Sequence, residues 1–267
     1  MRVLVLTLFM ATGLLSAAPA SAQLDVRLGG FLDKVGNTPV ADQAGFKSLS
    51  TDLGQILGPK MLGPAASAGG LGFDIGFDIA LGRLDPDNTH WETAVGSEQN
   101  SLTALQLQVR KGLPYGFELG AVVNHLVDSE LWGVGMNVKY SIIEGYRFLP
   151  DIAIRGWIST VLGSRDMSLL ISGGDFTVSK EFGIAGVVSL APYASYSLLY
   201  ARATAYIVPF FVDGQPQVER WRPDPENIIV HRGALGFKLV YAHASLAFEA
   251  MISGEMQIFT TRIGADF

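Results

Sequence analysis

The side chains that most readily carry out chemistry are few in this sequence and form no recognised pattern. Cysteine is absent, which excludes a disulfide scaffold, a thiolate zinc site and a cysteine nucleophile. The four histidines are His90, His125, His231 and His243. His90 lies among Asp85, Asp87 and Glu92, and a histidine polarised by a carboxylate can activate water or a serine. The spacing matches no hydrolase, metal-ligand or phosphate-binding motif, so we predict that the protein is not an enzyme and has no metal or cofactor.

Charged and amide side chains instead recur at every second residue, opposite apolar ones. In the segment 71–82, leucine, phenylalanine and isoleucine alternate with smaller or acidic residues. This period of two predicts a strand with one apolar face and one small or polar face. The pattern recurs along the chain to residue 252. The charged and amide residues on the second face, which are our candidates for lining a lumen, are Asp74, Asp78, Gln106, Arg110, Glu118, Lys139, Arg155, Lys238 and Glu249.

The composition indicates which environment the apolar faces meet. The chain of 267 residues is 49% hydrophobic and only 16% charged, yet beyond residue 15 no apolar run approaches the roughly 20 residues that a spanning helix needs. The second faces hold mainly glycine, alanine, serine, asparagine and glutamine with isolated charges, which suits a lumen better than bulk water. We therefore predict an all-β fold, a closed antiparallel transmembrane β-barrel. The net charge of −6 argues against a nucleic-acid partner.

The number of strands follows from the requirement that both ends of such a barrel usually lie on one side of the membrane. Ten strands satisfy it if 182–201 is a single strand, and twelve, with 24–32 added, is the alternative. With ten strands, the connections on one side are short, and the other side holds two long loops, 85–100 and 202–228. The predicted strands are 70–84, 101–111, 115–125, 131–143, 151–162, 167–179, 182–201, 229–241, 243–252 and 255–267.

The first 22 residues have the features of a cleaved export signal. Arg2 supplies a positive start, Val3 to Leu15 is nearly apolar, and Ala20-Ser21-Ala22 is a small-x-small cleavage site. The segment is too short for an anchor helix, and no stop-transfer charges follow it. We predict export and a mature chain that starts at Gln23.

The C-terminal segment carries a family resemblance. It ends in an aromatic residue with apolar residues at alternate upstream positions, and Phe259, Ile263 and Phe267 match this pattern, whereas Ala265 matches weakly and Thr261 departs from it. In this it resembles the terminal strand of Gram-negative outer-membrane β-barrels, porin-like proteins whose subfamily is not identified here. The resemblance implies an outer-membrane location, contact with membrane lipid and lipopolysaccharide, and assembly by the barrel-assembly machinery through this strand.

The segment 23–69 does not alternate and is predicted to contain a helix. Between Asp42 and Leu57, apolar residues fall at helical spacing, and Gly58-Pro59 ends the pattern. The apolar residues are Phe46, Leu49, Leu53, Ile56 and Leu57. Such a helix could lie in the lumen as a plug, at the membrane surface, or in the periplasm. We favour the lumen because small residues on the facing strands leave room for it, although glycine could merely permit curvature; these are Gly72, Gly76, Gly82, Gly116, Gly120, Gly133 and Gly135.

The chain is thus divided into a signal peptide (1–22), a segment with a plug helix (23–69) and the barrel (70–267). An N-terminal plug resembles the architecture of the long-chain fatty-acid transporter family, whose motifs are absent. The leading hypothesis is a channel or transporter for a small solute, with hydrophobic solutes included because of Phe46, Leu49 and Leu53. The alternatives are a plugged structural or adhesive barrel that displays 85–100 and 202–228, and a hydrolase with His125 and His231 at its rim. In the second loop, Arg220 and Arg222 could meet lipopolysaccharide phosphates.

Overall fold

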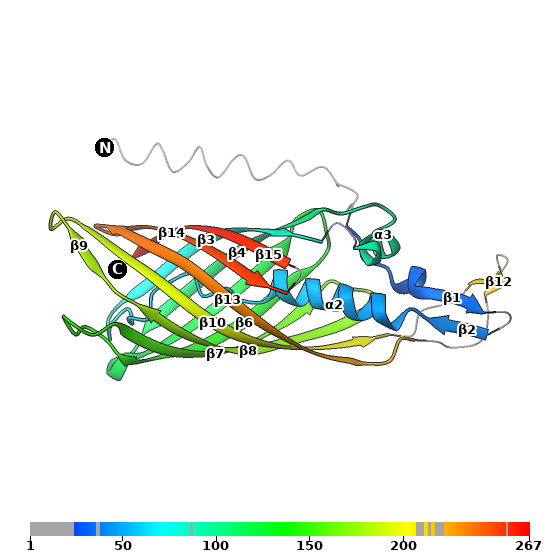
Figure 1. Ribbon diagram of the computed structural model, residues 1–267, viewed down its shortest axis with the longest axis horizontal. Coiled ribbons are helices and arrows are strands. Elements are labelled where there is room, and N and C mark those ends of the chain that lie inside the picture. Colours follow the sequence, from blue (N-terminus) through cyan, green and yellow to red (C-terminus); the bar gives the residue numbers. More distant parts are fainter. Residues whose placement is uncertain are drawn as a thin grey trace, which may run out of the picture.

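The computed structural model describes residues 24–267 except 36–37, 86–87, 207–210, 213–214, 217–221 and 255. The predicted signal peptide and Arg220 lie outside the described residues. Most of the described residues lie in strands, and these strands enclose a lumen that contains a helix (Figure 1). None of the described helices has the length and apolar character needed to cross a membrane.

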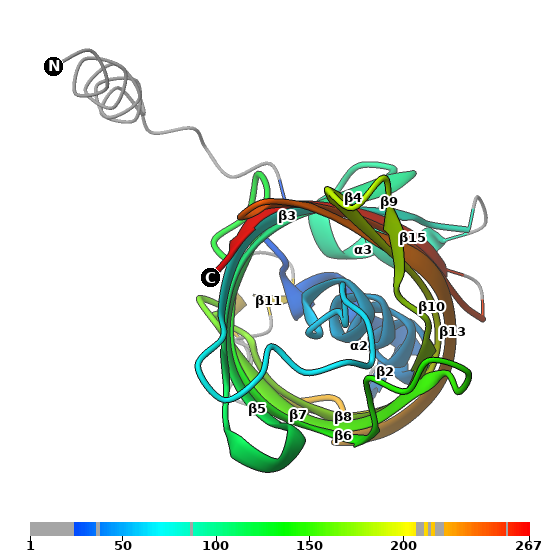
Figure 2. The same cartoon turned by 90° about the vertical axis from the view of Figure 1, so that its left-hand side faces the viewer.

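A closed antiparallel barrel of ten strands forms the body of the molecule, as the sequence predicted. Each strand pairs with the next, β10 pairs with β13 across the longest loop, and β15 pairs with β3 to close the ring. Figure 2 shows this ring along its axis. The strands are β3 (Phe73–Arg83), β4 (Ser101–Gly112), β5 (Phe117–Leu126), β6 (Trp132–Ile143), β7 (Asp151–Leu162), β8 (Met167–Ser179), β10 (Val188–Ala205), β13 (Glu226–Tyr241), β14 (Ala244–Ser253) and β15 (Met256–Asp266). The twelve-strand alternative is wrong, because 28–31 is a 3-10 helix, η1 (Leu28–Phe31).

The two ends of the barrel differ in their connections. The turn end holds Phe267 and the short connections 113–116, 144–150 and 242–243, and the loop end holds 84–100, 127–131, 163–166 and 206–225. Helix α3 (Thr89–Val95) lies within the first long loop, and the short strands β11 (Phe211–Val212) and β12 (Gln215–Pro216) lie within the other. The second loop is shorter than the predicted 202–228, because β10 and β13 extend their pairing to Ala203 and Glu226.

The prediction of one strand over 182–201 is wrong in detail. A separate strand, β9 (Phe182–Ile184), folds back on the start of β10 and projects at the turn end (Figure 1). The reversal occurs at Ala185 and Gly186, whose φ angles of 52° and 70° lie in the left-handed region. The strand count is unaffected, because β9 pairs with β10 alone among the described strands.

Side chains alternate between the lumen and the outer surface along the strands. On β3, exposed Phe77 and Ile79 alternate with buried Asp78 and Ala80. The outer surface is covered by exposed aromatic and aliphatic side chains on every strand of the ring. Water-soluble monomers rarely expose contiguous apolar patches above a few hundred Å². The outer surface is therefore suited to the hydrocarbon of a membrane.

The N-terminal segment runs through the inside of the barrel. After η1, a hairpin of β1 (Leu32–Val35) and β2 (Thr38–Ala41) leads into helix α2 (Gln43–Leu57). The helix begins where the carboxylate of Asp42 accepts a hydrogen bond from Gly45 N at 2.9 Å, and it ends at Gly58, as the sequence predicted. Figure 2 shows α2 within the ring of strands. The residues 58–69, here called the strap, then cross the lumen to β3.

Candidate functional site

The loop-end half of the lumen is filled by α2 and apolar side chains. The five predicted plug residues Phe46, Leu49, Leu53, Ile56 and Leu57 are all at most 1% exposed. They belong to one core cluster with side chains of β4, β5, β8 and β10, including Leu102, Leu126, Ile171 and Leu199. A Cβ on Gly54 would lie 3.4 Å from Ala201 Cβ and 3.9 Å from Leu199 Cδ2, so the helix approaches this part of the wall closely. This half of the lumen is packed like the core of a soluble protein.

The polar face of α2 borders a pocket at the loop end. The pocket has a volume of about 280 Å³ and is lined by Lys47, Thr51, Asp52 and Gln55 of the helix and by Ser253 of β14, among others. His90 Nε2 lies 2.8 Å from Asp52 Oδ2, and Trp91 Nε1 donates to the same oxygen at 2.9 Å. Because both donors belong to α3, this carboxylate fastens the first long loop to the helix.

The strap in the turn-end half has no regular secondary structure, and side chains of the wall bond its backbone. Lys139 Nζ donates to Ala66 O at 2.9 Å, and Ser141 Oγ donates to Ala65 O at 2.7 Å. In the other direction, Ala68 N donates to Glu118 Oε2 at 3.3 Å. Further bonds of this kind join Arg155 to Lys60 O, Arg110 to Leu62 O, Leu62 N to Glu249, Ala65 N to Ser179 and Ser67 N to Glu144. The wall therefore supplies the partners that a helix would have supplied to itself.

Ion pairs connect the wall side chains with each other. Asp74 accepts from Lys238 Nζ at 3.0 Å and from Arg110 Nε at 3.2 Å, and it also pairs with Arg262. Lys238 reaches Asp266 at 2.8 Å, and Lys139 pairs with Glu118 at 3.0 Å. Arg155 of β7 pairs with Asp175 of the neighbouring strand β8 at 2.5 Å. The ion pairs thus form a network of alternating sign on the inner wall.

All nine predicted lumen residues lie inside the barrel and are buried. Five of them, Arg110, Glu118, Lys139, Arg155 and Glu249, bond the strap instead of facing an open pore. Asp78 and Gln106 bond each other at 2.7 Å. A role of these nine residues in solute selectivity remains a prediction.

Sequence reasoning missed several inward residues. Arg262 was overlooked because its strand was considered for the terminal motif alone, although alternation with Ile263 places it on the inner face. Asp175 lies on a strand whose alternation is less regular in sequence, whereas Arg232 lies two residues before Ala234, on the face that alternation assigns to Lys238. Lys60, which is 2% exposed, belongs to the strap, where no periodicity predicts burial. Regular alternation could have found Arg262, but no local signal could have found Lys60.

The predicted glycines make room for different neighbours. A Cβ on Gly82 would come within 3.1 Å of Ile56, and one on Gly133 within 3.4 Å of Leu57 O, so these two do border the helix. Gly76 instead leaves space for Arg262, and Gly120 for Asn137. Gly116 is not on a strand face but in the turn before β5, with a φ of 77°. The prediction that these glycines make room for the helix is therefore confirmed for Gly82 and Gly133, and it is wrong for Gly76, Gly116 and Gly120.

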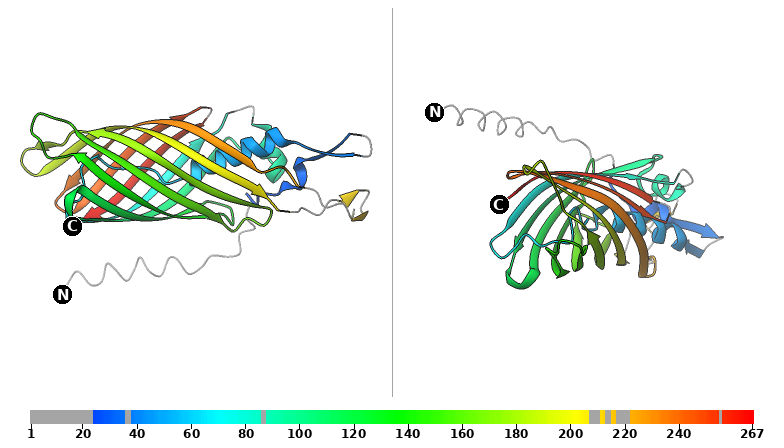
Figure 3. Two further views of the ribbon diagram at one scale, coloured as in Figure 1. Left: turned by 90° about the horizontal axis from the view of Figure 1, so that it is seen from below. Right: turned by 60° about the vertical axis from the view of Figure 1, so that its left-hand side comes forward.

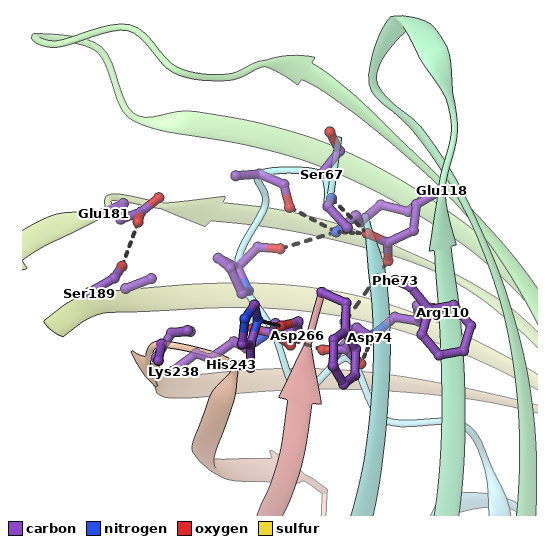
Figure 4. A pocket seen from close by; sticks show the side chains of 18 residues that line it. Ser67, Phe73, Asp74, Arg110, Glu118, Glu181, Ser189, Lys238, His243 and Asp266 are labelled. Carbon is purple, nitrogen blue, oxygen red and sulfur yellow. Dashed lines mark hydrogen bonds and ion pairs between the residues drawn. The ribbon is translucent and has the colours of Figure 1, made fainter. Parts of the chain in front are cut away.

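A second pocket opens at the turn end (Figure 4). It has a volume of about 400 Å³, and Asp74, Arg110, Glu118, Lys238 and Asp266 converge on it. His243 and Phe267 stand at its edge, with their rings stacked at 5.4 Å between centroids. The pocket therefore gives water access to the charged network from the end of the barrel that carries the C-terminus.

Buried polar atoms without hydrogen-bond partners lie between the two pockets. Atoms without a hydrogen-bond partner on the inner faces of β3, β4, β14 and β15 are Asp78 Oδ1, Gln106 Oε1, Gln108 Nε2, Glu249 Oε1 and Arg262 Nε. Asp78 Oδ1 lies 3.5 Å from Arg262 Nη1 and so has an ion-pair partner. Further atoms without a hydrogen-bond partner lie on β5, β6, β8 and β13. The wall between the two pockets is therefore polar, in contrast to the core around α2.

The histidines do not come together as a catalytic site. On the outer side of the barrel, His125 stacks on Trp132 at 4.2 Å, and His231 Nδ1 lies 2.5 Å from Tyr196 Oη. Neither histidine is paired with a carboxylate in the part of the chain that the structure describes. That part also contains no cluster of three or more potential metal-ligating residues. The rim hydrolase with His125 and His231 therefore has no supporting geometry.

No protein-family model and no curated protein sequence matches this chain. Among solved structures it is similar to the KdgM porin in complex with disordered oligogalacturonate, with a TM-score of 0.34, 9% identity, and coverage of 73% of this chain and 98% of the porin. It is also similar to the attachment invasion locus protein Ail of Yersinia pestis in complex with a heparin analogue (0.29, 12%, 74% and 99%). A third is the outer membrane protein Omp33 of Acinetobacter baumannii (0.28, 7%, 74% and 100%). The assignment of the barrel itself rests on the strand register described above.

Proposed function

We propose that the protein is an outer-membrane β-barrel that lets a small polar solute pass beside its lumenal helix. The predicted export signal, the closed ring of strands and the apolar outer surface support this location. A polar solute is preferred over the hydrophobic one considered from sequence, because Phe46, Leu49 and Leu53 are packed against the wall and line neither pocket.

The observation that carries the proposal is the pair of pockets that enter from opposite ends. The loop-end pocket reaches Gln55 and Ser253, and the turn-end pocket reaches Asp74 and Arg110. Between them lie buried polar side chains of β3, β4, β14 and β15, several of which have an atom without a hydrogen-bond partner. A polar solute can bond to such atoms, so it crosses this layer at a lower cost than it would cross the apolar core around α2.

The part of this path next to the loop-end pocket is apolar. Below Ser253, the inner faces of β14 and β15 carry Met251 and Ile258, which are 3% and 0% exposed. Both belong to the core cluster that includes Ile56 of α2. A displacement of the helix at this level would extend the loop-end pocket toward the polar layer, without exposing the whole core that holds α2.

Single-channel conductance of the refolded protein tests the proposal. Ile258→Ala widens the apolar part of the path and should raise the conductance or the open probability over those of the wild type. Leu169→Ala is the matched control, because Leu169 is equally buried but lies on β8, against the apolar side of the lumen. If neither the wild type nor Ile258→Ala conducts, or if Leu169→Ala conducts as well as Ile258→Ala, the path proposed here is wrong.

The C-terminal strand supports a further part of the proposal, recognition by the barrel-assembly machinery. Phe259, Ile263 and Phe267 are exposed on the outer surface, and Phe267 pairs with Phe73 through backbone bonds of 2.8 and 2.9 Å at the seam of the barrel. We expect Phe267→Ala to lower the amount of folded barrel in the membrane, as measured by heat-modifiable gel mobility.

A lipid contact is also part of the proposal. Arg222 is exposed at the loop end, and we propose that its guanidinium binds lipopolysaccharide phosphate.

A second candidate function is display of the loop end to a surface partner. The hairpin β1–β2 and the strands of the second long loop project beyond the barrel at this end, and α3 lies nearer to the ends of the strands (Figures 1 and 3). Adhesion that is lost when 207–224 is replaced by a short turn, with gel mobility of the barrel unchanged, would favour display over transport.

A further inference from the structure

The first described residues of the chain are fastened to the loop end of the barrel. Leu24 N donates to Asp128 O at 2.8 Å, and Arg27 N donates to Ala94 O at 3.0 Å. Leu28 N donates to Asp166 Oδ2 at 2.8 Å. The three acceptors belong to three different loop-end connections. This end of the chain is therefore held at the loop end by bonds that do not depend on one another.

From there the chain passes along the whole lumen to the opposite end. The helix α2 descends from Asp42, the strap continues from Gly58, and β3 begins at Phe73 beside the C-terminal Phe267. Figures 1 and 3 show the start of the segment and the C-terminus at opposite ends of the barrel. The segment thus does not enter and leave by the same opening, as a plug inserted from one side would do.

We infer that the N-terminal segment is threaded through the barrel, so that residues 24–35 lie on the side of the membrane opposite the C-terminus. The inference rests on the membrane location proposed above. If the C-terminus faces the periplasm, as in other barrels with an even strand number, the N-terminal end of the mature chain is on the cell surface. It lies there beside α3, to which Arg27 N donates a hydrogen bond at Ala94 O.

The lumen is the path by which this segment crosses. Asp25 and Arg27 are charged, and moving such groups through hydrocarbon is costly. The polar inner wall of the turn-end half lowers that cost for the part of the path that it lines.

The absence of cysteine makes the topology directly measurable with single-cysteine variants. The N-terminal probe is Arg27→Cys, whose native side chain is 76% exposed. The loop-end control is Arg165→Cys, at 71%, and the turn-end control is Phe148→Cys, at 88%. Intact cells are treated with a membrane-impermeant maleimide, and folding of each variant is checked by heat-modifiable mobility. If Arg27→Cys does not fold, Gly29→Cys replaces it, because a Cβ there meets nothing within 4 Å.

The expected result is that Arg27→Cys is labelled to the same extent as Arg165→Cys, whereas Phe148→Cys is labelled only after the membrane is permeabilised. If Arg27→Cys behaves like Phe148→Cys, threading is wrong even though the barrel is inserted. If Phe148→Cys alone is labelled on intact cells, the barrel is inverted, but the N-terminal segment is still threaded. If all three sites label alike, the protein is not inserted in a membrane, and both the location and this inference fail.

Discussion

The two halves of the lumen hold the same N-terminal segment by different means. In the loop-end half the segment is a helix, and its buried Leu49 and Leu53 belong to one core cluster with apolar wall residues such as Leu199. In the turn-end half the segment is the irregular strap, and the wall around it carries charged residues such as Lys139 and Glu118, which bond its backbone.

This difference shows what decides the chemistry of an inner wall. A helix satisfies most of its own backbone groups, so the wall beside it needs only apolar surface. An irregular segment leaves its N–H and C=O groups unpaired, so the wall beside it must supply donors and acceptors. The charges on the inner faces are therefore explained first by the strap and only second by a solute.

The largest effect is expected where one carboxylate balances three cations. Asp74 is 4% exposed and pairs with Arg110, Lys238 and Arg262. Asp74→Asn leaves these cations without that counter-charge, and breaking a buried pair typically costs about 3 to 5 kcal/mol. We expect the free energy of unfolding in urea and detergent to fall by that amount.

The matched control is Asp266→Asn. Asp266 bonds Lys238 as well, but its side chain is 25% exposed, so water can replace the lost partner. Its cost should be clearly smaller than that of Asp74→Asn. Equal costs for the two variants would mean that the network is hydrated throughout, and the proposed contrast between the two halves would be lost.

In the apolar half, stability should be lost through the removal of a buried apolar side chain. Leu53 lies in the core cluster around α2, and removing a buried leucine side chain typically costs about 3 kcal/mol. We expect Leu53→Ala to lower the free energy of unfolding by that amount and to increase protease access to the helix. Lys47→Ala, on the exposed side of α2, should have almost no effect. A large loss from Lys47→Ala would show that polar contacts also hold the helix.

The contrast also explains what could be predicted from sequence. Alternation in β3 placed Asp74 and Asp78 inside and Phe77 outside, because the period of a strand alone assigns its faces. The spacing of Phe46 and Leu53 gave the buried side of α2. The sequence could not predict the course of the strap or its partners in the wall. Bonds such as that between Lys139 and Ala66 O join residues that are far apart in sequence and have no periodic signal. The reversal at Ala185 was missed because alanine does not indicate a left-handed backbone.

The smallest expected effect concerns the start of α2, where the helix still needs help with its own backbone. Asp42 accepts from Gly45 N at 2.9 Å, and replacing such an N-terminal cap by alanine costs about 1 kcal/mol. Asp42→Ala should therefore lower the free energy of unfolding by about a third of the loss from Leu53→Ala, and Asp42→Asn, which keeps the acceptor, should be nearly neutral. If Asp42→Ala cost as much as Leu53→Ala, unpaired backbone groups would limit the stability of the loop-end half as well. The apolar and polar halves would then differ only in which partner satisfies the backbone.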